Sequence, residues 1–145
     1  MPRDADFGRE IASKLSDIYL GKINSVEFTY DAFVELDQLK ENEPYCIVST
    51  NAFDQIRETR AHWRETIQLV LTLVSAVGPT DGSDWVDNWL DSWDMTIRQV
   101  RELPLFDKHK PMSIDMEARY DVDIFHNSRR LVTQAMLNYQ NVEVI

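Results

Sequence analysis

The feature that most limits the fold of this chain is the apolar run from Ile67 to Val77 in its middle. The run is too short and too closely flanked by charged residues to span a bilayer. A segment that is apolar nearly all round is typical of a helix surrounded by other helices. We therefore predict that this run is the second half of a helix that begins at Ser49 or Thr50, ends before Gly78-Pro79 and forms the centre of the core.

Four further segments show the 3.6-residue periodicity of amphipathic helices. They run from Phe7 to Tyr19, from Asn24 or Ser25 to Leu39, from Ser83 to about Glu102, and from Asp121 or Asp123 to Tyr139. Four glycines and five prolines are too few for an all-β domain built on tight turns. We predict one all-α domain over residues 1–145, a bundle of about five helices, with a long loop from Leu103 to Tyr120.

The charge balance limits the choice of partner. The chain has 25 acidic and 15 basic side chains and a net charge of −10 with its histidines neutral. Phosphate binding requires the opposite sign, so a nucleic-acid backbone is not the expected partner. The single cysteine, Cys46, cannot form an internal disulfide, and charged residues interrupt the first twenty positions, so no signal peptide or membrane anchor is expected there. We expect a cytoplasmic protein.

The predicted helix from Ser83 to Glu102 has two contrasting sides. One side is aromatic and aliphatic and includes Trp85, Trp89 and Trp93. The other side carries four carboxylates at spacings of three and four residues: Asp84, Asp87, Asp91 and Asp94. Like charges at these spacings destabilise a helix by about 0.2–0.5 kcal/mol per pair. The row is either a solvated face opposite the core or a surface that meets a basic partner.

A second acidic row has the same geometry in the preceding predicted helix. It lacks a lysine or arginine at i+4 and consists of Glu27, Asp31 and Glu35. Two such rows suit a protein that binds a positively charged surface, such as the substrate groove of an RNA- or DNA-cutting toxin domain, because complementary charge speeds encounter and selects the partner. Solubility alone also explains a net charge of −10. These seven carboxylates and Trp85 are the candidate partner-binding residues.

The N-terminal third resembles a known family. Asp17-Ile18-Tyr19-Leu20-Gly21-Lys22-Ile23, followed by Ser25-Val26-Glu27-Phe28 and Tyr30, is similar to the start of the small helical immunity proteins of the colicin D type. In that family an early helix ends in a leucine-glycine-isoleucine turn, and the next begins with a glutamate-phenylalanine pair. The resemblance lies between Ile11 and Leu36. It implies a cytoplasmic protein that neutralises a nuclease toxin by covering its active site, often with acidic side chains.

An enzyme is the main alternative. Arg57 and His62 form an arginine-x4-histidine motif that resembles the signature of HEPN-type ribonucleases, which are all-α proteins. In these enzymes the arginine steadies the scissile phosphate and the histidine moves a proton. The spacing rule is loose, because Arg119 and His126 also satisfy it, and on a helical wheel Arg57 and His62 lie about 140° apart. Nearby acidic side chains would also repel an RNA phosphate.

Metal and covalent chemistry have less support in the sequence. Four possible ligands share the polar side of the predicted central helix: Asp54, Glu58, His62 and Glu65. Metal sites in helical bundles instead use paired Glu-x-x-His motifs from two helices, and the sequence contains no such motif. Cys46 is expected to be a small buried hydrophobe rather than an activated thiolate. We therefore predict no catalytic residue, no metal and no cofactor.

These patterns favour a small cytoplasmic all-α binding protein, most concretely an immunity protein or inhibitor that masks a basic site on a nuclease toxin. We expect a protein partner, with no direct contact to nucleic acid or membrane. The alternatives are a dimeric, metal-independent HEPN-like ribonuclease and a helical accessory subunit that docks through the tryptophan helix. The oligomeric state of the chain stays open.

Overall fold

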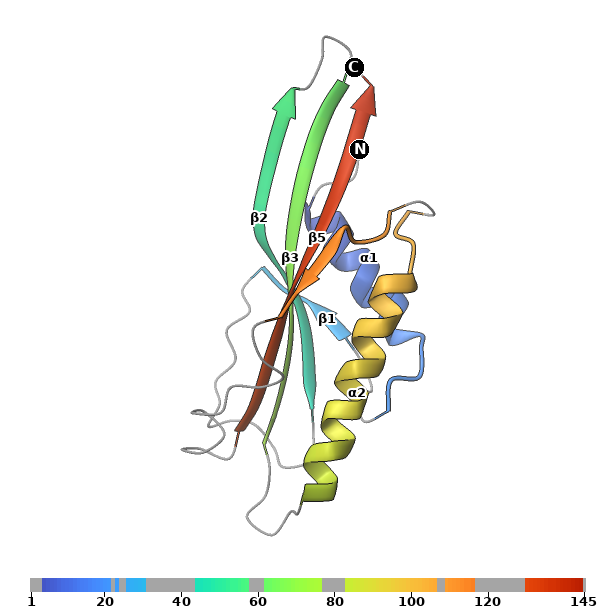
Figure 1. The fold of residues 1–145 in the computed structure, drawn as a ribbon, viewed down its shortest axis with the longest axis vertical. Coiled ribbons are helices and arrows are strands. Elements are labelled where there is room, and N and C mark those ends of the chain that lie inside the picture. The colour runs from blue at the N-terminus through green and yellow to red at the C-terminus, as the bar shows by residue number, and fades with distance from the viewer. Residues whose placement is uncertain are drawn as a thin grey trace.

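The computed structural model is a mixed α/β structure built on one five-stranded sheet (Figure 1). It describes residues 4–21, 23, 26–30, 44–57, 62–76, 83–106, 109–116 and 130–144. Within these ranges the elements are α1 (Asp4–Ser16), β1 (Val26–Phe28), β2 (Tyr45–Arg57), β3 (His62–Ala76), α2 (Ser83–Glu102), β4 (Ser113–Asp115) and β5 (Arg130–Val144). The predicted all-α bundle of about five helices is therefore wrong.

Three long strands form the body of the sheet. The strand order is β1-β2-β3-β5-β4, in which β1 is parallel to β2 and every other pair is antiparallel. The central strand β3 pairs with β5 from His62↔Val144 to Ala76↔Arg130 without a shift in register. It pairs with β2 with one register shift, between Thr50 and Ala52.

Both helices pack on the same face of this sheet and share one core with it. Alternate residues of β3 and β5 point to that face and are buried: Ile67, Leu69, Leu71, Leu73, Leu131, Ala135, Leu137 and Tyr139. The same hydrophobic cluster includes Phe7, Ile11 and Leu15 of α1 and Trp89, Trp93, Ile97 and Val100 of α2. The core therefore lies between the two helices and the sheet, and not inside a bundle.

The central apolar run forms the strand β3, and this strand is buried on both faces. Val70, Thr72 and Val74 alternate with the helix-facing leucines, yet they are buried as well. A strand that is covered on both sides reads as a continuous apolar segment, which periodicity alone does not separate from a buried helix. The prediction that Ile67 to Val77 forms the centre of the core is confirmed for residues 67–75, whose burial the structure describes, whereas the predicted helix is wrong.

The other predicted helices have mixed outcomes. The helix from Ser83 to Glu102 is confirmed as α2. The first helix is confirmed too, although α1 ends at Ser16, before Tyr19. The predicted second helix is wrong at its start, since β1 begins at Val26, and its residues 31–39 lie outside the described residues. The predicted last helix is wrong from Arg130 onward, where β5 begins, and residues 121–129 lie outside the described ranges.

The long strands extend past the helices. Figure 1 shows that the ends of β2, β3 and β5 project beyond α1, α2 and β4 as a three-stranded ribbon. We call this ribbon the arm and define it as Asn51–Arg57, His62–Thr66 and Gln140–Val144. The strand register places Asp54–Arg57 beside Trp63–Thr66, and His62–Thr66 beside Gln140–Val144. No helix in the described part of the chain is long and apolar enough to cross a membrane.

Candidate functional site

The outer side of α2 carries a row of exposed carboxylates. Asp87, Asp91 and Asp94 are all exposed, and their spacing of four and three residues places them on one stripe of the helix. Trp89 and Trp93, which lie between them in sequence, point the other way and are fully buried in the core. We call Asp87, Asp91 and Asp94 the acidic row.

The remaining residues of the predicted site on this helix are less informative. Asp84 and Trp85 lie in the first turn of α2, but their side chains lie outside the described residues. At the other end of the helix, Arg98 and Arg101 are exposed. Cations are favoured near a helix C-terminus, where the backbone carbonyl groups concentrate partial negative charge. The negative charge of the acidic row is therefore followed along α2 by positive charge.

The second predicted acidic row does not exist as a helical row. Glu27 is exposed, but it lies in the middle of β1, a strand parallel to β2. Its supposed neighbours Asp31 and Glu35 lie outside the described residues. Because β1 spans only Val26–Phe28, Glu27 lies in a short strand, and the helical stripe that grouped these three carboxylates is absent at Glu27.

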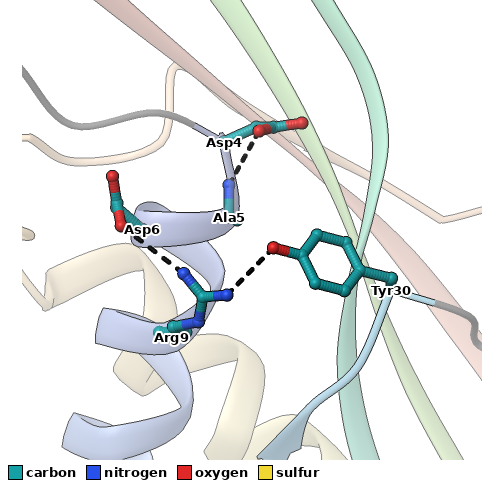
Figure 2. A network of polar contacts seen from close by, with 5 residues as sticks. All are labelled: Asp4, Ala5, Asp6, Arg9 and Tyr30. Carbon is teal, nitrogen blue, oxygen red and sulfur yellow. Dashed lines mark hydrogen bonds and ion pairs between the residues drawn. The ribbon is translucent and has the colours of Figure 1, made fainter.

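A cluster around Arg9 on α1 was missed at the sequence level (Figure 2). Nη2 of Arg9 donates a hydrogen bond of 2.9 Å to the hydroxyl of Tyr30, and Nη1 lies 3.6 Å from Oδ1 of Asp6. The guanidinium carbon lies 5.2 Å from the ring centre of Phe28 and 5.8 Å from that of Tyr30. Tyr30 is nevertheless 68% exposed. The cluster is a preorganised surface feature with an aromatic ring and a cation, both common at protein interfaces.

Gly8 makes this cluster possible. A Cβ built at Gly8 would lie 2.5 Å from Cε2 of Phe28, so only glycine lets the Phe28 ring approach α1 this closely. This contact joins α1 to β1, and its two residues, Gly8 and Phe28, lie 20 positions apart in the sequence. The sequence contains no local pattern that predicts the cluster, because Arg9 and Tyr30 come into contact only when β1 has joined the sheet beside α1.

The residues of the alternative enzyme and metal hypotheses lie on strands. Arg57 ends β2 across from Trp63, and His62 begins β3 across from Val144, so the HEPN-like motif does not lie on a helix of an all-α protein. Asp54 lies on β2 and Glu65 is buried on β3, while Glu58 lies outside the described residues. The described residues contain no group of three or more side chains that could hold a metal ion.

Two buried groups have shifted acidities. Cys46 is a free cysteine and is buried, as predicted, and burial raises the pKa of its thiol to about 12. Burial also raises the pKa of the Tyr139 hydroxyl above its ordinary value. A thiol with a raised pKa stays protonated near neutral pH and is a poor nucleophile. Cys46 therefore contributes to the packing of the hydrophobic core.

In the described part of the segment that resembles colicin D-type immunity proteins, the chain forms the end of α1, a turn at Gly21 and β1. The turn at Gly21 has a left-handed backbone, with a φ of 68°. Glu27 and Phe28, which the resemblance places at a helix start, lie in a strand instead. No protein-family model matches the chain, and no curated protein matches it.

Proposed function

We propose that this chain is a protein-binding module that docks the acidic row of α2 on a basic surface of a partner protein. The most concrete form of this function is an inhibitor or immunity protein that masks the basic substrate groove of a nuclease toxin domain. The observation that carries the proposal is the exposure of Asp87, Asp91 and Asp94 on a helix whose opposite side is buried in the core.

The acidic row and the net charge of the chain support this role in different ways. Three carboxylates on one stripe of a rigid helix match a row of lysine or arginine side chains, and such exposed charges act mainly on the rate of association and on partner choice. The net charge of −10 attracts a basic partner over a longer range, and this attraction weakens as the ionic strength of the solution rises. The compartment that we propose is the cytoplasm, because the lone cysteine has no second cysteine to pair with.

Matched charge variants test this function. The test variant is Asp87→Asn with Asp91→Asn, which removes two charges of the acidic row and keeps its shape. The control variant is Asp17→Asn with Glu102→Gln, which removes two exposed charges elsewhere. Proteins captured from an extract of the producing cells by immobilised wild type, but not by the test variant, are purified as candidate partners. Their association rates are then measured at about 50 and 500 mM salt.

We expect a basic partner whose association rate falls severalfold at the higher salt concentration. The rate should also fall severalfold with the test variant at low salt and stay close to wild type with the control variant. Equal capture by wild type and both variants, or association that ignores salt, would contradict a role for the acidic row.

An accessory role in a larger assembly is the second candidate function. The observation that favours it is the arm, which extends β2, β3 and β5 beyond both helices. A projecting ribbon offers backbone groups to other chains without disturbing the core. The HEPN-like ribonuclease is not proposed, because the all-α framework on which it rested is contradicted by the sheet.

A further inference from the structure

The outer edge of β5 is long and regular. On its inner side β5 pairs with β3 over its whole length without a register shift. Within the described ranges, β4 pairs on the outer side with Met136 to Asn138 only, and the amide of Met112 donates one hydrogen bond of 2.7 Å to the carbonyl of Asn138. Among the described residues, no strand pairs with the outer side of β5 from Tyr139 to Val144.

The hydrogen bond to Asn138 shows which backbone groups point outward. In an antiparallel sheet the N–H and C=O groups of one residue point to the same side, and successive residues alternate between the two sides. The carbonyl of Asn138 points to β4, so the N–H and C=O groups of Gln140, Val142 and Val144 point outward as well. The backbone groups of Tyr139, Asn141 and Glu143 point to β3.

The two outer edges of the arm differ in how they are protected. Natural sheets block unwanted pairing with bulges, prolines and charged residues. The arm segment of β2 begins at a register shift and carries Asp54 and Arg57. The arm segment of β5 has no register shift, no proline and one charged residue, Glu143. The edge of β5 is therefore the better template for another strand.

We propose that this edge pairs with the same edge of a second copy of the chain. The two β5 strands run antiparallel about a two-fold axis at Val142, so Val142 faces Val142 of the second copy and Gln140 faces Val144. This register uses the outward backbone groups of both strands and forms up to about six hydrogen bonds. It places Glu143 opposite Asn141, so no like charges face each other. The pairing joins two arms into one continuous sheet with closed two-fold symmetry.

The charge of the chain sets the conditions for this dimer. Two copies with a net charge of −10 each repel one another, and salt screens that repulsion. The paired surface is also small, since it consists of a few residues of one strand from each copy. We therefore expect a dimer that forms at high protein concentration and is favoured by salt. A contact dominated by opposite charges would show the reverse dependence on salt.

Sedimentation velocity of the full chain tests the dimer. The test variant is Val142→Pro, which removes an outward N–H group and spares the bonds to β3. The matched control is Val132→Pro, which removes an outward N–H group of the same strand outside the proposed register. Wild type and control should shift from monomer to dimer with concentration, and more so at about 500 mM salt, while Val142→Pro should stay monomeric. A wild-type chain that is monomeric throughout, or a Val142→Pro chain that dimerises like the control, would overturn the proposal.

A cross-linking experiment tests the register even if the proline variant fails to fold. Facing residues of a hydrogen-bonded pair have Cα atoms about 5.5 Å apart, which suits a disulfide. In a Cys46→Ala background, Val142→Cys should form a covalent dimer when oxidised glutathione is supplied as the oxidant. The control Gln140→Cys faces Val144 of the second copy and should stay monomeric. Equal cross-linking of the two variants, or none of either, contradicts this register.

Discussion

Gly21 shows how one residue fixes the turn between α1 and β1, where the backbone passes close to α2. Its φ of 68° lies in the left-handed region, which glycine adopts without steric cost. A Cβ at this position would also collide with Oγ of Ser92 on α2. Gly21→Ala should therefore lower the free energy of unfolding by about 1–3 kcal/mol. Urea unfolding followed by circular dichroism measures this loss, with the exposed Ser13→Ala as the control. An unchanged midpoint in Gly21→Ala would show that the turn is free to move.

Cys46 links the stability of the fold to alkaline pH. The thiol ionises near pH 9 in the unfolded chain, whereas burial raises its pKa in the folded chain to about 12. Between these values the folded chain binds more protons, so the free energy of unfolding falls as pH rises, by up to about 1.4 kcal/mol per pH unit. Tyr139 adds a fall of the same sign above its ordinary pKa.

The Cys46→Ala variant should flatten the part of this fall that begins near pH 9. Denaturant unfolding at several pH values from about 8 to 11 gives the slope for each chain. The slopes are compared rather than the absolute stabilities, because the alanine also leaves a small cavity. The expectation fails if the two chains lose stability in parallel over this range.

At the scale of elements, the sequence was informative wherever one element had one buried side. α2 was predicted with its ends because its apolar stripe and acidic row repeat with the helical period, and the exposure of Asp87, Asp91 and Asp94 follows from the same pattern. β3 was misassigned because both of its faces are buried. In β5, Leu131, Ala135 and Tyr139 fit a helical spacing of four as well as the strand period of two. The Arg9 cluster depends on strand pairing, which no local pattern encodes.

Leu71 tests the central strand. Its burial was predicted for a helix and is confirmed in β3, where it faces the two helices between Val48 and Ala135. Leu71→Ala should lower the free energy of unfolding by about 2–5 kcal/mol, because it leaves a cavity in the middle of the core. Chemical denaturation measures the loss against Thr66→Ala, a half-buried position of the same strand. A loss no larger than that of Thr66→Ala would place the core elsewhere.

The side chain of Asn138 on β5 links this strand to the short strand β4 by hydrogen bonds. Its side-chain nitrogen donates to Oγ of Ser113 at 3.0 Å and to Oδ2 of Asp115 at 2.9 Å, and its side-chain oxygen accepts a bond of 3.0 Å from Gln68. Asn138→Ala removes all three and should speed hydrogen exchange in β4, with little change in the pairing of β3 and β5. Gln134→Ala, which loses a bond to Thr72, is the control on the same strand. Uniformly faster exchange across the sheet would contradict a local role.

At the scale of the whole molecule, the hydrophobic core that holds the fold together is separate from the two surfaces proposed for binding. One continuous core joins α1, α2 and the sheet, while the acidic row lies outside it and the arm projects beyond it. Changes to the acidic row or to the arm edge should therefore leave the core intact. This separation makes the two proposals independent, since loss of partner binding and loss of dimerisation come from different variants.

The net charge should also affect the thermal stability of the chain in the absence of any partner. A compact chain with a charge of −10 repels itself more strongly than its unfolded form does, so salt should raise the thermal unfolding midpoint. The acidic row concentrates part of this repulsion on one helix face. Asp87→Asn, Asp91→Asn and Asp94→Asn combined should therefore raise the midpoint at about 20 mM salt and reduce its gain on going to about 500 mM. Scanning calorimetry of both chains measures the effect. A lower midpoint for the triple variant would mean that attraction between these carboxylates and other groups of the fold outweighs their repulsion, and the acidic row would then be structural rather than a surface kept for a partner.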